Sequence, residues 1–214
     1  MERSLSRLSL LNPGKLKVLL SLGFKGYLAQ KNWFRAYETK TSIDENNTPV
    51  PWVTYSFIDF IKSRINTTHS IFEYGSGNST IFYAGKAKSV TSVEHDKSWY
   101  ETVTNLKLPN AEILFCALKE NGEYCRKAVS TNRKYHIIIV DGRDRVNCCK
   151  YALQALTEDG VLILDDSERP YYEEAIDFLK QSGFKHIPFS GMAPGTIQSK
   201  CTSVFYKTHN CLDI

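Results

Sequence analysis

The feature that most constrains the fold is a series of short apolar segments along residues 70–207, with helix-like segments between them. The least ambiguous segment is Tyr135–Val140, which contains the consecutive β-branched residues Ile137, Ile138, Ile139 and Val140. A strand without polar alternation is typical of a sheet that is covered on both faces, and such sheets are mainly parallel with helices on each side. The sequence therefore predicts a doubly wound, mainly parallel α/β domain.

Seven segments are rich in β-branched and aromatic residues, as strands are. They are Ser70–Tyr74, Ser89–Glu94, 111–116, Tyr135–Val140, 160–164, 184–189 and 202–207. The segments expected as helices are 54–65, 79–87, 97–106, 146–156 and 170–181. Because open α/β sheets bind ligands at the carboxyl ends of their strands, the loops that follow the strands are where a site is expected.

Residues 1–48 precede this pattern and are expected to form a helical accessory segment, and residues 49–214 are expected to form the α/β domain. The apolar stretch 16–24 is too short to span a bilayer, so no transmembrane segment is expected. Two interpretations of the accessory segment stay open: a helical cap on the core, or a weak contact with a membrane surface. The second would use the basic residues Arg3, Arg7, Lys15 and Lys17.

Charge and cysteine spacing give no indication of a nucleic-acid partner or a zinc site. The formal net charge is +4 and no run of five basic residues occurs, so no nucleic-acid partner is expected. The cysteines form no Cys-x-x-Cys pair, which disfavours a zinc site and favours free thiols in a cytoplasmic protein.

Two loops carry the pattern of a nucleoside site. The first loop contains Glu73, Gly75 and Gly77, an acid followed by two glycines that allow a tight turn and a close approach of a ligand to the backbone. The second loop begins with Glu94, an acid at the end of the next strand that could accept hydrogen bonds from ribose hydroxyls. This spacing also fits NAD, but Thr80 stands where the dinucleotide pattern requires a third glycine.

Together, Phe-Glu-Tyr-Gly-Ser-Gly-Asn-Ser-Thr at 72–80 and Val-Glu-His-Asp at 93–96 resemble the first two motifs of class I S-adenosylmethionine-dependent methyltransferases. The resemblance covers about residues 52–207 and implies a Rossmann-like, seven-stranded methyltransferase sheet whose last strand is antiparallel. It implies that S-adenosylmethionine is the cofactor, with the methionine part near the glycine loop and the ribose on Glu94. The expected cofactor-binding residues are Glu73, Tyr74, Gly75, Ser76, Gly77, Ser79, Glu94, His95 and Asp141.

Three carboxylates follow the fourth and fifth expected strands: Asp141, Asp165 and Asp166. Their layout is similar to that of metal-dependent O-methyltransferases, including those that act on sugars, and the resemblance implies that they could bind Mg²⁺. The alternative is that Arg143 or Arg145, which depart from that pattern, pairs with the carboxylates in place of a metal.

The expected reaction is methyl transfer to an oxygen of a small hydroxylated acceptor such as a sugar or glycan precursor, by resemblance. The residues expected to assist deprotonation of the acceptor are Asp141, Asp144 and Asp166. Two other functions stay open: a non-catalytic nucleotide-binding module on the same fold, and a nicotinamide-dependent oxidoreductase. The sequence defines neither the acceptor nor the oligomeric state.

Overall fold

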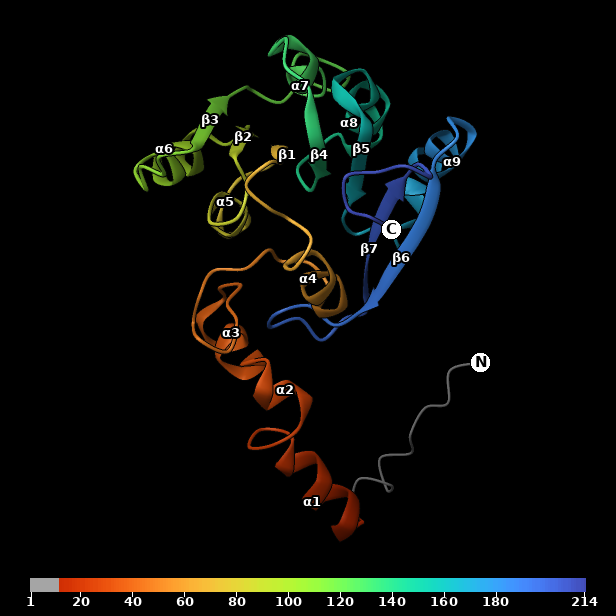
Figure 1. Cartoon of the computed structure of the whole chain (residues 1–214). Helices are drawn as coiled ribbons and strands as arrows, with labels where there is room; N and C mark the ends of the chain where they lie inside the picture. The colour runs from red at the N-terminus through yellow and green to blue at the C-terminus, as the bar shows by residue number, and fades with distance from the viewer. Residues whose placement is uncertain (1–11) are drawn as a thin grey trace.

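The expected strands pair into one seven-stranded sheet in the computed structural model, which describes residues 12–214 (Figure 1). The strand order is β3-β2-β1-β4-β5-β7-β6. The first five strands in this order are parallel, and β7 is antiparallel to both of its neighbours. The strands are β1 (Ser70–Tyr74), β2 (Ser89–Glu94), β3 (Ala111–Phe115), β4 (Tyr135–Val140), β5 (Leu156–Leu164), β6 (Lys185–Gly191) and β7 (Lys200–Tyr206). The predicted architecture, including the antiparallel last strand, is confirmed.

The helices that connect the strands mostly follow the predicted segments. They are α4 (Tyr55–Ile61), α5 (Asn78–Ala84), α6 (Lys97–Thr104), α7 (Lys127–Ser130), α8 (Arg145–Ala152) and α9 (Glu173–Gln181). The short α7 was not predicted, and the predicted helix 146–156 is too long at its C-terminal end. A turn of 3-10 helix at Leu153–Ala155 ends it, and β5 begins at Leu156.

The four β-branched residues of β4 divide between two cores. Ile138 and Val140 pack in a cluster with residues of α8 and α9, whereas Ile137 and Ile139 pack in a second cluster with residues of α4 and α5. Successive side chains of a strand point to opposite faces, so a sheet with helices on both faces needs an uninterrupted apolar run. All six cysteines of the chain are free.

The N-terminal helices are α1 (Pro13–Ser21), α2 (Tyr27–Gln30) and α3 (Trp33–Thr39). Only part of the predicted cap packs on the core: α3 buries Trp33 and Ala36, but α1 buries no residue. Figure 1 shows α1 projecting away from the sheet and its helices. The prediction of a packed cap is therefore right for α3 and wrong for α1.

The proposed contact residues Arg3 and Arg7 lie outside the described residues, and the boundary near residue 48 stays a prediction. Between residues 12 and 214, the helices are all too short or too polar to cross a membrane.

The strand register brings the functional loops together. Tyr74 of β1 lies opposite Val93 of β2 and Val140 of β4, and Val140 lies opposite Leu164 of β5. The loops that follow these strands therefore begin at one edge of the sheet, where parallel α/β sheets form their sites.

Candidate active site

At two positions of the loop after β1, the backbone has a positive φ that only glycine adopts without strain. Gly75 has φ +99° and Gly77 has φ +151°. A Cβ on Gly75 would come within 3.5 Å of the backbone of Gly142, so the loop also packs closely on the end of β4. Thr80 holds the start of α5, because its Oγ1 accepts a hydrogen bond (3.0 Å) from the Gly77 N–H.

Glu73 ties this loop to β2. Its carboxylate is buried and accepts hydrogen bonds from the hydroxyls of Thr80 (2.6 Å) and Ser92 (2.8 Å), both at Oε2. Burial raises the pKa of Glu73, and the hydrogen bonds from hydroxyl groups oppose that rise. Thr80, at the position where NAD-binding loops have glycine, is thus used to hold the acid of the loop.

Glu94, at the end of β2, lies next to the glycine loop. One carboxylate oxygen accepts hydrogen bonds from the backbone N–H groups of His95 (2.7 Å) and Asp96 (2.9 Å), and the other accepts one from the Ser76 hydroxyl (3.0 Å). The side chain of His95 contacts the same carboxylate, with Nδ1 2.9 Å from Oε1. The acid is therefore fixed in orientation by neutral donors on both of the loops that the sequence singled out.

Trp99 is a lining residue that the sequence analysis missed. Asp96 caps α6 through the Trp99 N–H (2.9 Å), and this places the indole over the glycine loop, where Nε1 donates to the Ser76 carbonyl (2.8 Å). The ring also lies against Gly77, since a Cβ there would be 3.4 Å from it. The available signal was Asp96, a helix-capping residue three positions before an aromatic side chain.

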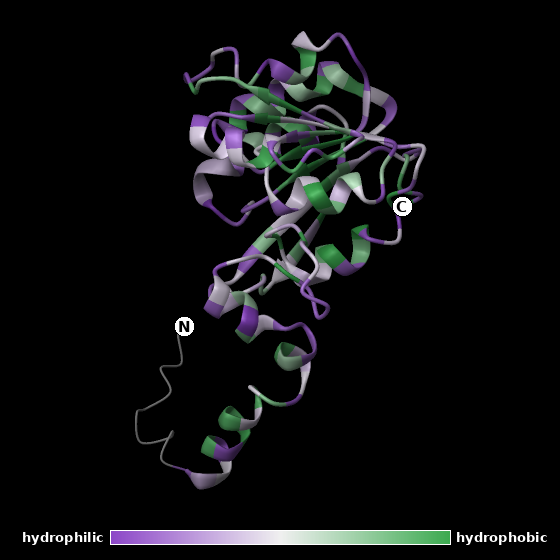
Figure 2. Cartoon of the chain, turned by 90° about the vertical axis from the view of Figure 1, so that its left-hand side faces the viewer, coloured by the Kyte–Doolittle hydropathy of each residue, from purple (hydrophilic) through white to green (hydrophobic). Residues whose placement is uncertain are grey.

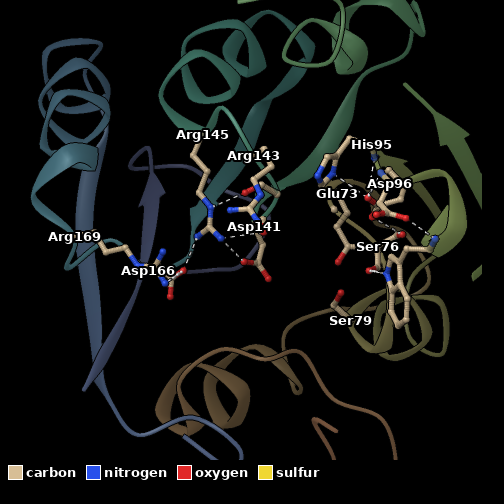
Figure 3. Close-up of a pocket in the computed structure, with 14 residues that line it drawn as sticks. Glu73, Ser76, Ser79, His95, Asp96, Asp141, Arg143, Arg145, Asp166 and Arg169 are labelled. Atoms are coloured by element: carbon tan, nitrogen blue, oxygen red, sulfur yellow. Dashed lines mark hydrogen bonds and ion pairs between the residues drawn. The ribbon is translucent and has the colours of Figure 1, made fainter. Parts of the chain in front are cut away.

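These groups line a cavity of about 520 Å³, within the range of ligand pockets. Figure 3 shows Glu73, Ser76 and Ser79 on one side of it and Asp141, Arg145 and Asp166 on the other. A second cavity of about 640 Å³ shares Asp141, Asp166 and Arg169 with the first and reaches Trp52 and Lys200. Of the predicted residues, those that line the first cavity are Glu73, Gly75, Ser76, Ser79, Glu94, His95, Asp141 and Asp166. Four predicted residues are not among them: Tyr74, which packs in the core, Gly77, which lines a neighbouring cavity, Asp144 and Asp165.

The predicted metal ligands are paired with cations. The Arg145 guanidinium lies 3.0 Å from a carboxylate oxygen of Asp141 and 3.3 Å from one of Asp166, and Figure 3 shows it between these two acids. Asp166 is also 2.7 Å from the guanidinium of Arg169. Arg143, the other candidate for this pairing, lines the cavity and forms no ion pair within residues 12–214.

Lys200 of β7 completes the network. Its ammonium lies 2.8 Å from Asp165 and 2.8 Å from Asp166, and it donates to the carbonyl of Trp52 (3.0 Å). Asp165 is fully buried and also accepts from the Thr202 hydroxyl (2.7 Å). No three His, Cys, Asp or Glu side chains in the described part of the chain could hold a metal ion together. The predicted Mg²⁺ site therefore does not fit, because Arg145 and Lys200 stand among the carboxylates.

The two acids that line both cavities, Asp141 and Asp166, have opposite pKa shifts. Burial, followed by the charge of Asp165, raises the pKa of Asp141 to about 8, although Arg145 opposes the rise. Burial would also raise the pKa of Asp166, but the hydrogen bond and charge of Lys200, with the charge of Arg145, lower it overall. Near neutral pH, Asp141 is therefore the acid that can exchange a proton, and Asp166 is a fixed anion.

Asp144 does not face either cavity. Its carboxylate accepts hydrogen bonds from the Asn121 backbone N–H (2.9 Å) and the Asn147 side-chain amide (2.7 Å), and its backbone is left-handed with φ +51°. The prediction of a catalytic role for Asp144 is not supported by this geometry, because the side chain holds the turn before α8.

No protein-family model matches the sequence, and comparison with curated proteins gives no match either. Solved structures do match. Precorrin-6y C5,15-methyltransferase from Geobacter metallireducens is similar with a TM-score of 0.57 and 11% identity, over 78% of this chain and 98% of the other. An rRNA methylase from Streptococcus thermophilus is similar with a TM-score of 0.52 and 16% identity, over 70% of this chain and 92% of the other.

A Streptococcus mutans protein assigned as a methyltransferase, whose structure contains S-adenosylhomocysteine, matches with a TM-score of 0.50 and 13% identity. That match covers 69% of this chain and 94% of the other. At such identities the likeness shows the fold. The sheet order, the antiparallel β7 and these neighbours agree: the chain has the fold of the class I S-adenosylmethionine-dependent methyltransferases.

Proposed function

We propose that this chain is an S-adenosylmethionine-dependent methyltransferase. The observation that carries the proposal is the placement of Glu94 beside the glycine loop, in one cavity with Asp141. Glu94 is oriented by backbone N–H groups and by Ser76, so that a ribose hydroxyl could share or replace the Ser76 hydroxyl as its donor. Among the neighbours, the Streptococcus mutans structure in complex with S-adenosylhomocysteine supports this choice of ligand.

The residues of the loop suit the parts of this cofactor. Gly75 and Gly77 allow the tight turn that lines the cavity, and the exposed indole of Trp99 offers an aromatic face at the same rim. When bound, the cofactor would supply a methyl group on a sulfonium, from which a neutral thioether can leave without help from a metal. The protein then has to align the acceptor oxygen with the methyl carbon and the sulfur, and to exclude water.

Asp141 is proposed to receive the proton of the acceptor hydroxyl as the oxygen–carbon bond forms and the carbon–sulfur bond breaks. Its pKa of about 8 suits a base that works near neutral pH. Arg145 acts as a positioning residue: Nη2 donates to both the carbonyl and the carboxylate of Asp141, at 3.0 Å each. Arg145 is thus proposed to hold the carboxylate of Asp141 in place, and no step runs through a metal.

The proposed acceptor is a small hydroxylated compound such as a sugar or glycan precursor, bound in the second cavity. Trp52 offers a half-exposed indole there, fixed by a hydrogen bond from Nε1 to the Thr196 hydroxyl (3.1 Å). An aromatic face beside carboxylates and a guanidinium is suited to a ring with hydroxyl groups. The neighbours are named for acceptors as different as rRNA and a precorrin, so the acceptor class rests on this cavity alone.

Calorimetry with S-adenosylhomocysteine and with NAD⁺ tests the proposal. We expect binding of the first and none of the second, because Thr80 fills the place of the third glycine and bonds Glu73. Methyl transfer from labelled S-adenosylmethionine to a panel of sugars, nucleotide sugars and phenols then separates an enzyme from a non-catalytic module. Binding of NAD⁺ alone would refute the methyltransferase proposal.

A further inference from the structure

The first helix among residues 12–214, α1, exposes apolar side chains that no other part of the described structure covers. Along α1 and the turn after it, Leu16, Val18, Leu19 and Leu20 are 47–64% exposed and Phe24 is 88% exposed. None of the residues of α1 is buried. We call residues 13–25 the arm. Figure 2 shows its hydrophobic segments well away from the body of the domain.

The charge of the arm has one sign. Lys15, Lys17 and Lys25 are its only ionisable side chains, and no acid occurs between Glu2 and Glu38. None of these lysines forms an ion pair within residues 12–214. A second copy of the arm would carry the same positive charge and repel it, whereas an anionic surface would attract it.

The arm cannot span a bilayer. The helix has 9 residues, so it is about 14 Å long at 1.5 Å per residue, against about 30 Å of hydrocarbon. A short helix that combines exposed leucines with lysines suits the interface between the lipid headgroups and the acyl chains, where lysine ammonium groups reach the phosphates.

The segment that follows the arm, α3 and residues 40–42, packs on the end of the domain that carries the site. Trp33 of α3 is buried and donates to the Thr196 carbonyl (3.3 Å), and Asn78 after the glycine loop donates to the Ser42 carbonyl (2.9 Å). Residues 40–42 line a cavity together with Ser76 and Trp99. The chain therefore leaves the site end of the domain through α3 and reaches the arm through α2.

We propose that the arm docks this protein on an anionic lipid bilayer, with Leu19, Leu20 and Phe24 among the acyl chains and Lys15, Lys17 and Lys25 at the phosphates. Docking does not depend on the proposed methyl transfer and is measured separately from it.

Vesicle sedimentation of the full-length protein tests the proposal. We expect binding to vesicles of phosphatidylcholine and phosphatidylglycerol in equal parts, and little binding to phosphatidylcholine alone. The triple variant Lys15→Glu/Lys17→Glu/Lys25→Glu should lower the partition coefficient on the mixed vesicles about tenfold or more, because it reverses every charge of the arm. The variant Leu20→Glu/Phe24→Glu should lower it as strongly, because it puts charge where acyl chains would lie.

Matched controls carry the same changes elsewhere on the surface. Lys119→Glu/Lys180→Glu/Lys185→Glu makes the same change in net charge, and Leu106→Glu/Leu118→Glu replaces two leucines that are 46% and 45% exposed. Both controls should retain most of the binding, and the arm variants should keep the thermal midpoint of the parent, because α1 buries nothing.

The proposal would be overturned by equal binding of the parent and both arm variants, or by no binding of the parent to the mixed vesicles. If vesicle binding is absent, light scattering of the parent shows whether it self-associates. Self-association that Leu20→Glu/Phe24→Glu abolishes would assign the arm to a second copy of the chain.

Discussion

The two sides of the sheet edge hold their carboxylates by different means. At the ends of β1 and β2, Glu73 and Glu94 accept hydrogen bonds from hydroxyls and backbone N–H groups, and only the ring of His95 could add a charge. At the ends of β4 and β5, Asp141, Asp165 and Asp166 lie among the side chains of Arg145, Lys200 and Arg169.

This difference in partners suits the acids after β1 and β2 to ligand binding and the acids after β4 and β5 to the proposed proton transfer. Neutral donors add no positive charge beside the acid and allow a ligand hydroxyl to join or replace one donor. Cations instead cancel the charge, and a buried network of this kind is costly to break because each removed partner leaves an ion without compensation. The β1–β2 side is thus suited to bind a polar ligand, and the β4–β5 side to keep one acid, Asp141, in a fixed and unusual state.

The strongest test of this contrast is Asp141→Asn. Because the amide cannot accept the acceptor proton, methyl transfer should fall by about 10²–10⁴-fold, while S-adenosylhomocysteine should still bind through the β1–β2 side. Single-turnover rates and calorimetry measure the two effects. Asp144→Asn is the control, and it should retain activity because Asp144 faces neither cavity. Loss of activity in Asp144→Asn alone would reverse the assignment.

The next largest effect is expected on stability. Lys200→Met leaves Asp165 and Asp166 without their shared cation and should lower the free energy of unfolding by about 3–5 kcal/mol, as measured in urea. Lys62→Met is the matched control: its ion pair with Asp59 is exposed and should contribute less than about 1 kcal/mol. Equal losses in the two variants would show that the Lys200 network is not buried in solution.

On the other side of the edge, Glu94→Ala should weaken S-adenosylhomocysteine binding by about 1–3 kcal/mol, since ribose hydroxyls would lose their acceptor. The free energy of unfolding should change less than in Lys200→Met, because no buried cation is left unpaired. Glu101→Ala, an exposed change on α6, serves as the control. Unchanged affinity in Glu94→Ala would place the ribose elsewhere.

The raised pKa of Asp141 gives a pH dependence. A base must be deprotonated, so the rate of the chemical step should rise with pH and level off above about 8, with about a tenfold fall per pH unit below it. Arg145→Lys, which keeps a positive charge, should hold the midpoint closer to the parent than Arg145→Met, which removes a cation that lowers this pKa. A flat profile between pH 6 and 9 would argue against Asp141 as the base.

The smallest expected effect is that of a chelator. Because Arg145 and Lys200 stand among the acids, EDTA should leave the rate of methyl transfer unchanged, and added Mg²⁺ should not raise it. Activity that is lost in EDTA and restored by Mg²⁺ would show that the carboxylates rearrange around a metal during turnover.

Much of the fold could be predicted from local pattern. Element type depends on residues close in sequence, so the continuous apolar run of β4 and the glycines before α5 identified a strand and a tight turn without tertiary information. The start of β5 at Leu156 was missed, because the polar stretch Thr157–Gly160, which resembles a loop, lies inside the strand. The exposed α1 was missed for the opposite reason, since its leucines follow the spacing of a packed helix.

The sequence by itself determined the alternation of strands and helices, the loops that meet at the sheet edge, and the residue types that those loops present. Only the tertiary structure decided which of these residues pair. Arg145, which follows β4, pairs with Asp166, which follows β5. Lys200 pairs with Asp165, although the two residues are 35 positions apart in the sequence. The three carboxylates bind either a metal ion or the side chains of Arg145 and Lys200, depending on which charges come within about 4 Å of them. Those distances are set by strand order and register, about which the local sequence carries little information.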